Sequence, residues 1–262
     1  MHFGIIVFPG TNCDRDCAHV ISNVLGHTSA MVWHENTDLS AFDALIVPGG
    51  FAHGDYLRTG AIARFSPVMD SIAEFASYSK PVIGICNGFQ ILCEAGLLPG
   101  ALRRNASQHF ICRVDAHLRV ENNNNQFLHL ASIGDVLTMP VRHGDGSYFA
   151  DADTLAAMEA NGQILLRYSD ARGNVTPAVN ANGSVGNIAG VMSEDGNVFG
   201  LMPHPEAASE KILGSDQGLY IFRSMLKPLT TNRATTRNSG FFNTNADDVD
   251  IAYTSPDPGP RI

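Results

Sequence analysis

A cysteine between two glycines carries the strongest chemical signal in the sequence. Gly84-Ile85-Cys86-Asn87-Gly88 has the form Gly-x-nucleophile-x-Gly and follows an apolar run expected to be a strand. A nucleophile elbow has this pattern, because a tight, strained turn exposes the nucleophile and the glycines remove side chains that would collide. The sulfur would lie at a helix N-terminus, where the macrodipole favours negative charge and backbone N–H groups face an oxyanion. Taken alone, Cys86 is equally well explained as a small buried thiol.

His204-Pro205-Glu206 supplies the partners that such a thiol needs. A thiol that attacks an amide requires a base, and a histidine base is usually oriented by an acidic side chain. Pro205 favours an extended backbone at His204, and side chains at positions i and i+2 of an extended segment face the same side. We therefore predict that Cys86, His204 and Glu206 form a triad for amide cleavage. The alternative is a surface histidine in a proline turn.

Three further residues are candidates for binding the substrate or the oxyanion. Gly50 follows a second apolar run, so its N–H group could complete an oxyanion hole with the N–H group of Asn87. An ordinary Gly-Gly turn is the alternative. Gln90 lies one helical turn after Cys86, on the same face. Its amide could bind polar groups of a substrate or cap a buried backbone group.

Two other groups of polar residues are assigned no chemistry. His143, Gly144 and Asp145 form a polar turn, and we predict a contact surface for a partner there. Cys13 and Cys17 are four residues apart, but no second ligand pair at a zinc-like spacing accompanies them. We expect these two cysteines to be buried structural thiols, and we predict no metal site.

The first hundred residues alternate apolar runs with helical patterns. Strands are expected at 3–8, 28–33, 44–47 and 81–85, and helices at 14–25, 61–78 and 86–95. This rhythm predicts an α/β fold with a doubly wound, mostly parallel, flavodoxin-like sheet. Ligands of such sheets bind beyond the carboxyl ends of the strands. The loops at 9–14 and 49–55 and the turn at Cys86 all leave strands at that edge.

The rest of the chain changes character twice. Patterns at 110–120, 135–141 and 163–168 predict antiparallel strands added to the same core, with a helix at 152–160, a last core strand at 198–202 and a helix at 210–226. We therefore predict one domain over residues 1–228. Residues 229–262 are rich in Thr, Asn, Asp, Ser and Pro, and such a segment buries too little apolar surface to offset its ordering entropy. We predict a polar tail that is mobile or lies on the surface.

Composition excludes some classes of protein. The net charge of −9 over 262 residues argues against binding nucleic-acid backbones, which depends on Lys and Arg. No apolar run reaches the roughly 18 residues that span a bilayer, and the first residues predict a strand instead of a signal peptide. Five cysteines, an odd number, suit a reducing compartment. We predict a cytoplasmic protein without nucleic-acid or membrane partners.

Taken together, these motifs resemble the class I glutamine amidotransferases. The resemblance rests on Cys86 with its flanking glycines and Gln90, on His204-Pro205-Glu206, and on Gly49-Gly50. The segment from Phe8 to Asp16 and the turns at 96–102, 143–146 and 182–184 narrow the similarity to the glutaminase subunits of phosphoribosylformylglycinamidine synthase. The resemblance covers about residues 3–226.

The resemblance implies a function and a set of partners. Cys86 would attack glutamine to form a thioester, His204 would act as base and then acid, Glu206 would orient His204, and Gly50 would assist the oxyanion hole. Ammonia would pass to a separate synthetase subunit, which converts formylglycinamide ribonucleotide to formylglycinamidine ribonucleotide in purine biosynthesis, and a small subunit would bridge the two. No cofactor is implied in this chain; ATP and Mg²⁺ are expected on the synthetase partner.

The sequence departs from the family pattern at several positions, and two alternative functions also stay open. Ala52-His53 stands where the family carries Ser-Tyr. Ala207 and Ser147 stand where this family commonly carries arginines, which affects expected partner contacts and leaves the triad intact. One alternative is a free-standing glutaminase or an ammonia donor for another pathway. The other is a non-catalytic relative that senses redox state or binds a ligand, although such a protein gives no reason for His204 and Glu206.

Overall fold

A single mixed sheet forms the centre of the computed structural model, which describes residues 1–226. Its order is β2-β1-β3-β4-β11-β10-β9-β6-β7. The first five strands are parallel, and the remaining four continue the sheet in antiparallel pairs. The prediction of a doubly wound parallel sheet with added antiparallel strands is confirmed. The strands are β1 (His2–Val7), β2 (Thr28–Trp33), β3 (Ala44–Val47), β4 (Val82–Ile85), β6 (Ile111–Val120), β7 (Val136–His143), β9 (Ile164–Ser169), β10 (Ile188–Met192) and β11 (Val198–Leu201).

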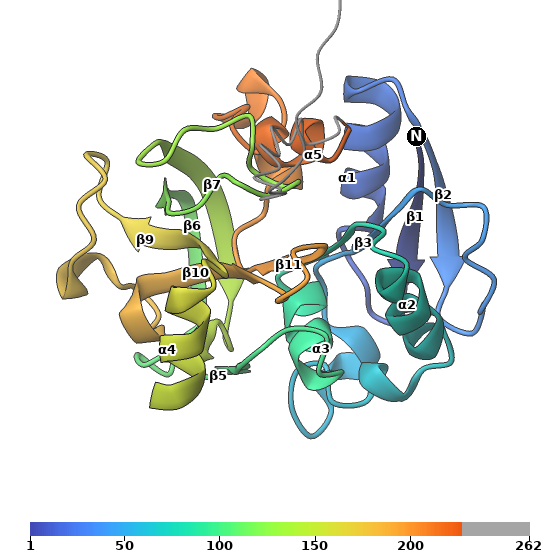
Figure 1. Cartoon of the computed structure of the whole chain (residues 1–262), viewed down its shortest axis with the longest axis horizontal. Coiled ribbons are helices and arrows are strands. Elements are labelled where there is room, and N and C mark those ends of the chain that lie inside the picture. Colours follow the sequence, from blue (N-terminus) through green and yellow to red (C-terminus); the bar gives the residue numbers. More distant parts are fainter. Residues whose placement is uncertain (227–262) are drawn as a thin grey trace, which may run out of the picture. The chain divides into compact units, whose positions relative to one another are not determined.

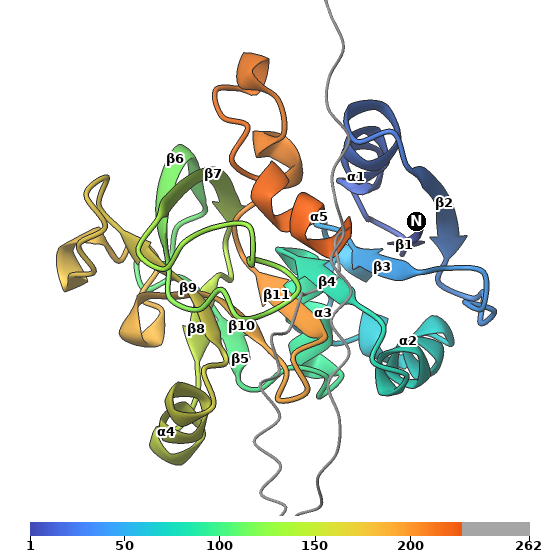
Figure 2. The same cartoon turned by 45° about the horizontal axis from the view of Figure 1, so that its top comes forward.

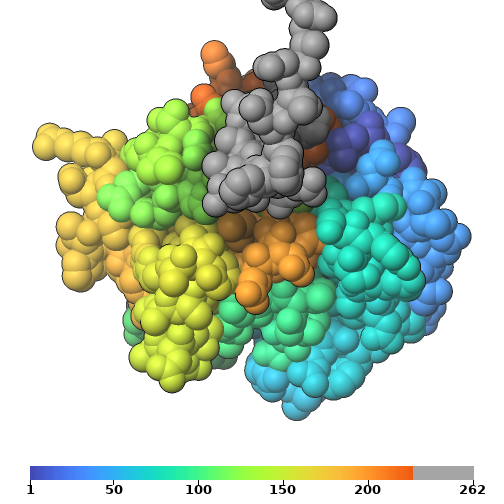
Figure 3. All heavy atoms as spheres, in the orientation of Figure 1, coloured from blue at the N-terminus to red at the C-terminus, as the bar shows by residue number. Residues whose placement is uncertain are grey.

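Helices cover both faces of the parallel half. In two views, α1 (Asp14–His19) and α5 (Leu219–Leu226) lie on one face, and α2 (Val68–Ser77) and α3 (Asn87–Glu94) lie on the other (Figures 1 and 2). Every residue of β3 and β4 is buried, as expected of central strands covered on both sides. The space-filling view places the blue and cyan early segments on one side and the yellow α4 (Ala152–Ala160) on the other (Figure 3).

Two predicted helices are shorter than expected. The helix predicted at 61–78 is a short 3₁₀ turn (Ala63–Phe65) followed by α2, because Ser66 precedes Pro67 and is extended, with ψ 143°. The helix predicted at 210–226 is interrupted at Gly214, whose φ of +99° is left-handed. The sequence patterns also missed β10 and the small sheet of β5 (Ala101–Arg103) and β8 (Ser147–Phe149).

Several predictions fall at the limits of the described region. The predicted domain boundary at residue 228 and the tail at 229–262 lie outside the described residues and stay predictions. Within residues 1–226, no helix has the length and apolar character required to cross a membrane.

The loops at the carboxyl edge of the parallel strands hold one another in place. The N–H groups of Asn12 and Cys13 both donate to the Gly49 carbonyl oxygen at 3.0 Å, and the Phe51 N–H group donates to the Gly10 carbonyl oxygen at 2.9 Å. A Cβ atom at Gly10 would lie 2.3 Å from the Phe51 carbonyl oxygen, so the close approach of the two loops requires glycine there. The two loops are therefore held against each other at the edge of the sheet where ligands are expected.

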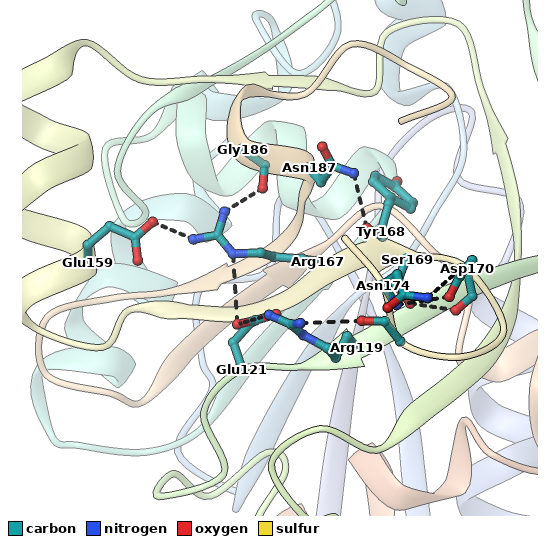
Figure 4. A network of polar contacts seen from close by, with 11 residues as sticks. Arg119, Glu121, Glu159, Arg167, Tyr168, Ser169, Asp170, Asn174, Gly186 and Asn187 are labelled. Carbon is teal, nitrogen blue, oxygen red and sulfur yellow. Dashed lines mark hydrogen bonds and ion pairs between the residues drawn. The ribbon is translucent and has the colours of Figure 1, made fainter. Parts of the chain in front are cut away.

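An ion-pair network ties the antiparallel half to the elements around it (Figure 4). The Arg167 guanidinium on β9 donates to Glu159 of α4 and to the Gly186 carbonyl oxygen, and its Nε lies 3.9 Å from Glu121. Arg119 donates to Glu121 at 2.7 Å and to the Gly173 carbonyl oxygen at 3.3 Å. The Arg167 side chain is only 13% exposed, so its partners have little water to replace it.

We predict that Arg167→Ala lowers the free energy of unfolding by about 1–3 kcal/mol, because it removes the donor to the Gly186 carbonyl oxygen and to the Glu159 carboxylate, while Glu121 keeps Arg119. Denaturant unfolding measures the loss. Arg113→Ala is the matched control: its contact with Asp115 joins side chains that are 48% and 61% exposed, and such pairs contribute about 0–1 kcal/mol. Equal losses in the two variants would contradict the role of the network.

Candidate active site

Cys86 lies in a strained turn between β4 and α3. Its φ of 51° and ψ of −105° are unusual for a residue with a side chain, and its N–H group donates to the Leu201 carbonyl oxygen at 2.8 Å. A Cβ atom at Gly84 would lie 2.5 Å from Leu92, and one at Gly88 would lie 1.8 Å from the Val47 carbonyl oxygen. Both flanking glycines are therefore required by close packing, and the predicted elbow geometry is confirmed.

His204 and Glu206 are neighbours directly after β11. The His204 Nδ1 and Glu206 Oε1 atoms are 2.5 Å apart, and the side chains are only 3% and 1% exposed. The extended geometry predicted for this segment is wrong beyond His204. Pro205 has helical angles, φ −66° and ψ −29°, and Glu206 begins a 3₁₀ turn. The carboxylate thus reaches the imidazole through a turn, because Pro205 restricts the residue before it and leaves its own ψ free.

The electrostatics of His204 reflect this pairing. Burial alone would lower its pKa, but the negative charge of Glu206, and after it Cys86, raise the pKa of His204 well above the ordinary histidine value. The ring Nε2 has no hydrogen-bond partner among the described residues. A carboxylate on one ring nitrogen and no partner on the other are the features of a histidine positioned for proton transfer.

Gly49 separates the cysteine from the histidine. A Cβ atom at this position would lie 2.9 Å from His204 Cε1 and 3.4 Å from Cys86 Cβ. The two side chains therefore border the same small space at the end of β3. The Cys86 thiol donates to the Arg142 carbonyl oxygen, with 3.6 Å between Sγ and O. The structure thus brings together all three residues of the predicted triad.

The two proposed oxyanion donors border the same elbow. Among the described residues, no acceptor binds the Gly50 N–H group, and Asn87 is the first residue of α3, where N–H groups have no acceptor within the helix. The Asn87 side chain also contacts the Gly50 loop, because its Oδ1 accepts from the Ala52 N–H group at 2.9 Å. The elbow and the Gly50 loop are thereby joined.

Gln90 connects the elbow to the polar turn at 143–146. Its Oε1 accepts from Asn87 Nδ2 at 2.9 Å, and its Nε2 donates to the Asp145 carbonyl oxygen at 2.7 Å. Of the two interpretations left open by the sequence, capping a buried backbone group is the one observed, and substrate binding stays a prediction.

The polar turn is part of the site wall. The His143 side chain is buried and bonded to Asn105, and burial together with the nearby His204 lowers the pKa of His143 to about 4. The predicted partner contacts of His143, Gly144 and Asp145 stay predictions. Ser147, one of the departures from the family pattern, is buried in β8.

A pocket opens directly over Cys86. Its wall contains two carboxylates, Asp55 and Asp145. Burial, and then the charge of Asp145, raise the pKa of Asp55 to about 6. The lining residues are Gly50, Phe51, Asp55, Thr59, Cys86, Gln90, Phe110, Arg142, His143, Gly144 and Asp145.

Sequence reasoning missed two residues that support this site. Cys13 Sγ lies 3.9 Å from His204 Nδ1, although the residue was expected to be only a structural thiol. It lies in one of the loops at the carboxyl edge, a signal that could have identified it. Asn105 is fully buried; its Oδ1 accepts from the Gly146 N–H group at 3.0 Å and its Nδ2 donates to the His143 carbonyl oxygen at 2.8 Å. Nothing in its sequence context indicated this role.

Comparison with known proteins identifies the group to which these features belong. Residues 1–218 match the family described as the CobB/CobQ-like glutamine amidotransferase domain. Phosphoribosylformylglycinamidine synthase subunit PurQ of Salinibacter ruber is 55% identical over 224 residues, which cover 86% of this chain and 95% of that protein. PurQ of Moorella thermoacetica is 53% identical over 226 residues, with 86% and 95% covered.

Solved structures agree with this assignment. A chain in the structure of PurLQS from Thermotoga maritima is 40% identical, with a TM-score of 0.76, covering 86% of this chain and 97% of that one. A glutamine amidotransferase from the same organism, 15% identical with a TM-score of 0.50, shows a likeness of fold alone. The chain therefore belongs to the CobB/CobQ-like glutamine amidotransferase family, in the branch that contains the PurQ subunits.

Proposed function

We propose that the chain is the glutaminase subunit of phosphoribosylformylglycinamidine synthase. It hydrolyses glutamine to glutamate and delivers ammonia to a separate ATP-dependent synthetase subunit, which converts formylglycinamide ribonucleotide to formylglycinamidine ribonucleotide. The observation that carries the chemistry is Cys86 in a strained elbow beside a buried His204–Glu206 pair. The purine-pathway role is supported by the PurQ relatives, and the complex with other subunits by the likeness to PurLQS.

The proposed reaction uses three side chains and two backbone donors. The Cys86 sulfur attacks the side-chain amide carbon of glutamine, while His204 holds the thiol proton and then gives it to the leaving ammonia. Glu206 fixes the ring orientation and stabilises the imidazolium. The N–H groups of Gly50 and Asn87 bind the oxyanion of each tetrahedral intermediate. Water then attacks the thioester, with His204 as base, to release glutamate.

The carboxylates of the pocket suit the other end of glutamine. Asp55 and Asp145 both line the pocket that contains Cys86, and a pair of carboxylates favours an ammonium group. We assign the α-ammonium group of glutamine to these two carboxylates.

We predict a pH-dependent KM for glutamine. Because the pKa of Asp55 is raised to about 6, its carboxylate becomes neutral as the pH falls through that value, and KM should rise on the acid side. Asp55→Asn should raise KM about 10-fold or more at pH 8, which corresponds to one charge-assisted hydrogen bond, and should remove this pH dependence. Steady-state kinetics from pH 5 to 8 measure both. Asp70→Asn on the exposed face of α2 is the control; an unchanged profile in Asp55→Asn would refute the assignment.

Glutaminase assays of the purified chain, alone and with the synthetase and the small subunit, test the proposed function. We expect weak activity alone and strong stimulation in the assembled complex with its nucleotide substrates. Full activity of the isolated chain would instead favour a free-standing glutaminase, and no observation here favours that alternative. ATP and Mg²⁺ on the synthetase, and a cytoplasmic location, are part of this proposal.

A further inference from the structure

A third ligand-type side chain, which the glutaminase reaction does not use, lies beside the His204–Glu206 pair. Cys13 lies on the side of His204 that bears Nδ1, with 3.9 Å between Sγ and Nδ1. One ligand-type atom from each of Cys13, His204 and Glu206 lies within 4.8 Å of the other two. Thiolate, imidazole and carboxylate are the donors that zinc prefers, whereas Mg²⁺ prefers oxygen ligands alone.

From this geometry we propose that Cys13, His204 and Glu206 form an inhibitory site for a zinc ion, which binds on the side of the His204 ring that bears Nδ1.

The distances fit a tetrahedral ion with a small rearrangement. Zinc bonds of about 2.3 Å to sulfur and 2.0–2.2 Å to nitrogen and oxygen separate neighbouring ligands by roughly 3.4–3.6 Å. The Cys13–His204 distance of 3.9 Å is close to this separation. The His204–Glu206 distance of 2.5 Å is shorter, so the ion must part these two groups. Zinc would therefore replace the hydrogen bond that orients the catalytic histidine, and the enzyme would lose activity.

An unsatisfied oxygen supplies an independent indication of a ligand. Glu206 Oε2 is buried and has no hydrogen-bond partner among the described residues, and the whole side chain is only 1% exposed. A buried carboxylate oxygen without a donor is costly, and a metal ion would satisfy it. Gly49 keeps the adjacent space open, since a Cβ atom there would lie 3.2 Å from Cys13 Sγ.

A surface cavity lies against Glu206. Its lining includes Glu206 itself together with Asp16, His19 and Glu210, while Arg142 is its one arginine. His19 and Glu210 are in contact at 2.8 Å, and their side chains are 49% and 39% exposed. Carboxylates that line a cavity raise the local concentration of cations, so this cavity favours the approach of a divalent ion.

Cobalt substitution tests the ligand set without any enzymatic assay. The metal-free full chain, kept reduced, is titrated with Co²⁺, which reports a bound thiolate by a charge-transfer absorption band. We expect one Co²⁺ per chain and a band that disappears in Cys13→Ser and persists in Cys86→Ser and in Cys17→Ser. A band lost in Cys86→Ser and kept in Cys13→Ser would show that the metal binds Cys86 instead of Cys13, and would overturn the proposal. The absence of any band in the wild-type chain would also overturn it.

Zinc affinity, measured by competition with a chromophoric chelator, shows how much each side chain contributes to binding. Cys13→Ser and Glu206→Gln should each weaken binding by more than about 100-fold, beyond the 10–100-fold cost of altering outer-shell groups. If Cys13→Ser fails to fold, zinc protection of Cys13 from alkylation in the wild-type chain, located by mass spectrometry, decides the question: unprotected Cys13 refutes the site.

The Zn²⁺ concentration that halves glutaminase activity should rise in Cys13→Ser by the same factor as the zinc affinity falls. Each rate is compared with the uninhibited rate of the same variant. Mg²⁺ should not inhibit. Equal inhibition of the wild type and Cys13→Ser would contradict the proposal. Because the cobalt band and the zinc affinity need no turnover, failure of the proposed function and failure of the metal site are distinguishable.

Discussion

Cys86→Gly is expected to lower glutaminase activity by about 10⁶-fold, the scale on which loss of a triad nucleophile acts, and to give a more stable protein than Cys86→Ala. The reason for the second effect is the backbone of the elbow. At φ 51° and ψ −105° a side chain costs about 1–3 kcal/mol, whereas glycine adopts these angles freely. Glycine loses about 0.5–1 kcal/mol more conformational entropy on folding, so a net gain of about 1 kcal/mol over alanine remains.

Denaturant unfolding of the two variants, together with a glutaminase assay in the assembled complex, measures both effects. The comparison of glycine with alanine removes the contribution of the sulfur, since neither variant carries it. Cys93→Gly and Cys93→Ala, in the last turn of α3, are the matched controls: there the backbone is helical, and glycine should be the less stable by about 0.5–1 kcal/mol. The same order at both positions would show that the elbow stores no strain.

Glu206→Gln is expected to reduce kcat by about 10⁴-fold while leaving KM nearly unchanged, because it removes the group that orients His204 and stabilises its charged form. Stability should respond as well. The pKa of His204 is raised in the folded state, so the pairing stabilises the protein fully below the ordinary histidine pKa of about 6.5 and less as the pH rises through the raised value. The wild-type advantage over Glu206→Gln in free energy of unfolding should therefore shrink above about pH 6.5.

Rapid kinetics and unfolding from pH 5 to 9 test these expectations. Glu210→Gln provides the control, because Glu210 also contacts a histidine, His19, but both side chains are substantially exposed, 39% and 49%. That variant should keep its activity to within a few-fold. A loss in Glu206→Gln no greater than in Glu210→Gln would remove Glu206 from the triad.

The sequence determined most of the parallel half of the sheet and the position of the elbow. β2 and β3 begin and end where the predicted strands do. β3 is buried on both faces, and a strand of this kind reads as a continuous apolar segment. The close approach behind Gly84 and Gly88 follows from the elbow pattern itself. These features are local, so a single sequence was sufficient to predict them.

The features that escaped prediction depend on contacts between distant segments. Cys13 reaches His204 across 191 positions, and no local pattern encodes that meeting. β10 is five buried residues, Ile-Ala-Gly-Val-Met, with a glycine in the middle and no alternation, so it gave no strand signal. The turn at Pro205 was misjudged because proline restricts the preceding residue and leaves its own ψ to the surrounding packing.

The two amide side chains on the first turn of α3 have a mechanical consequence. Asn87 accepts a hydrogen bond from Ala52 in the loop of Gly50, and Gln90 donates one to Asp145 in the turn of residues 143–146. The two amides are hydrogen-bonded to each other. The first turn of α3 thus connects the turn of residues 143–146 to the backbone donors proposed for the oxyanion. A subunit that displaced the turn of residues 143–146 would change the rate of ammonia release without contacting Cys86, His204 or Glu206.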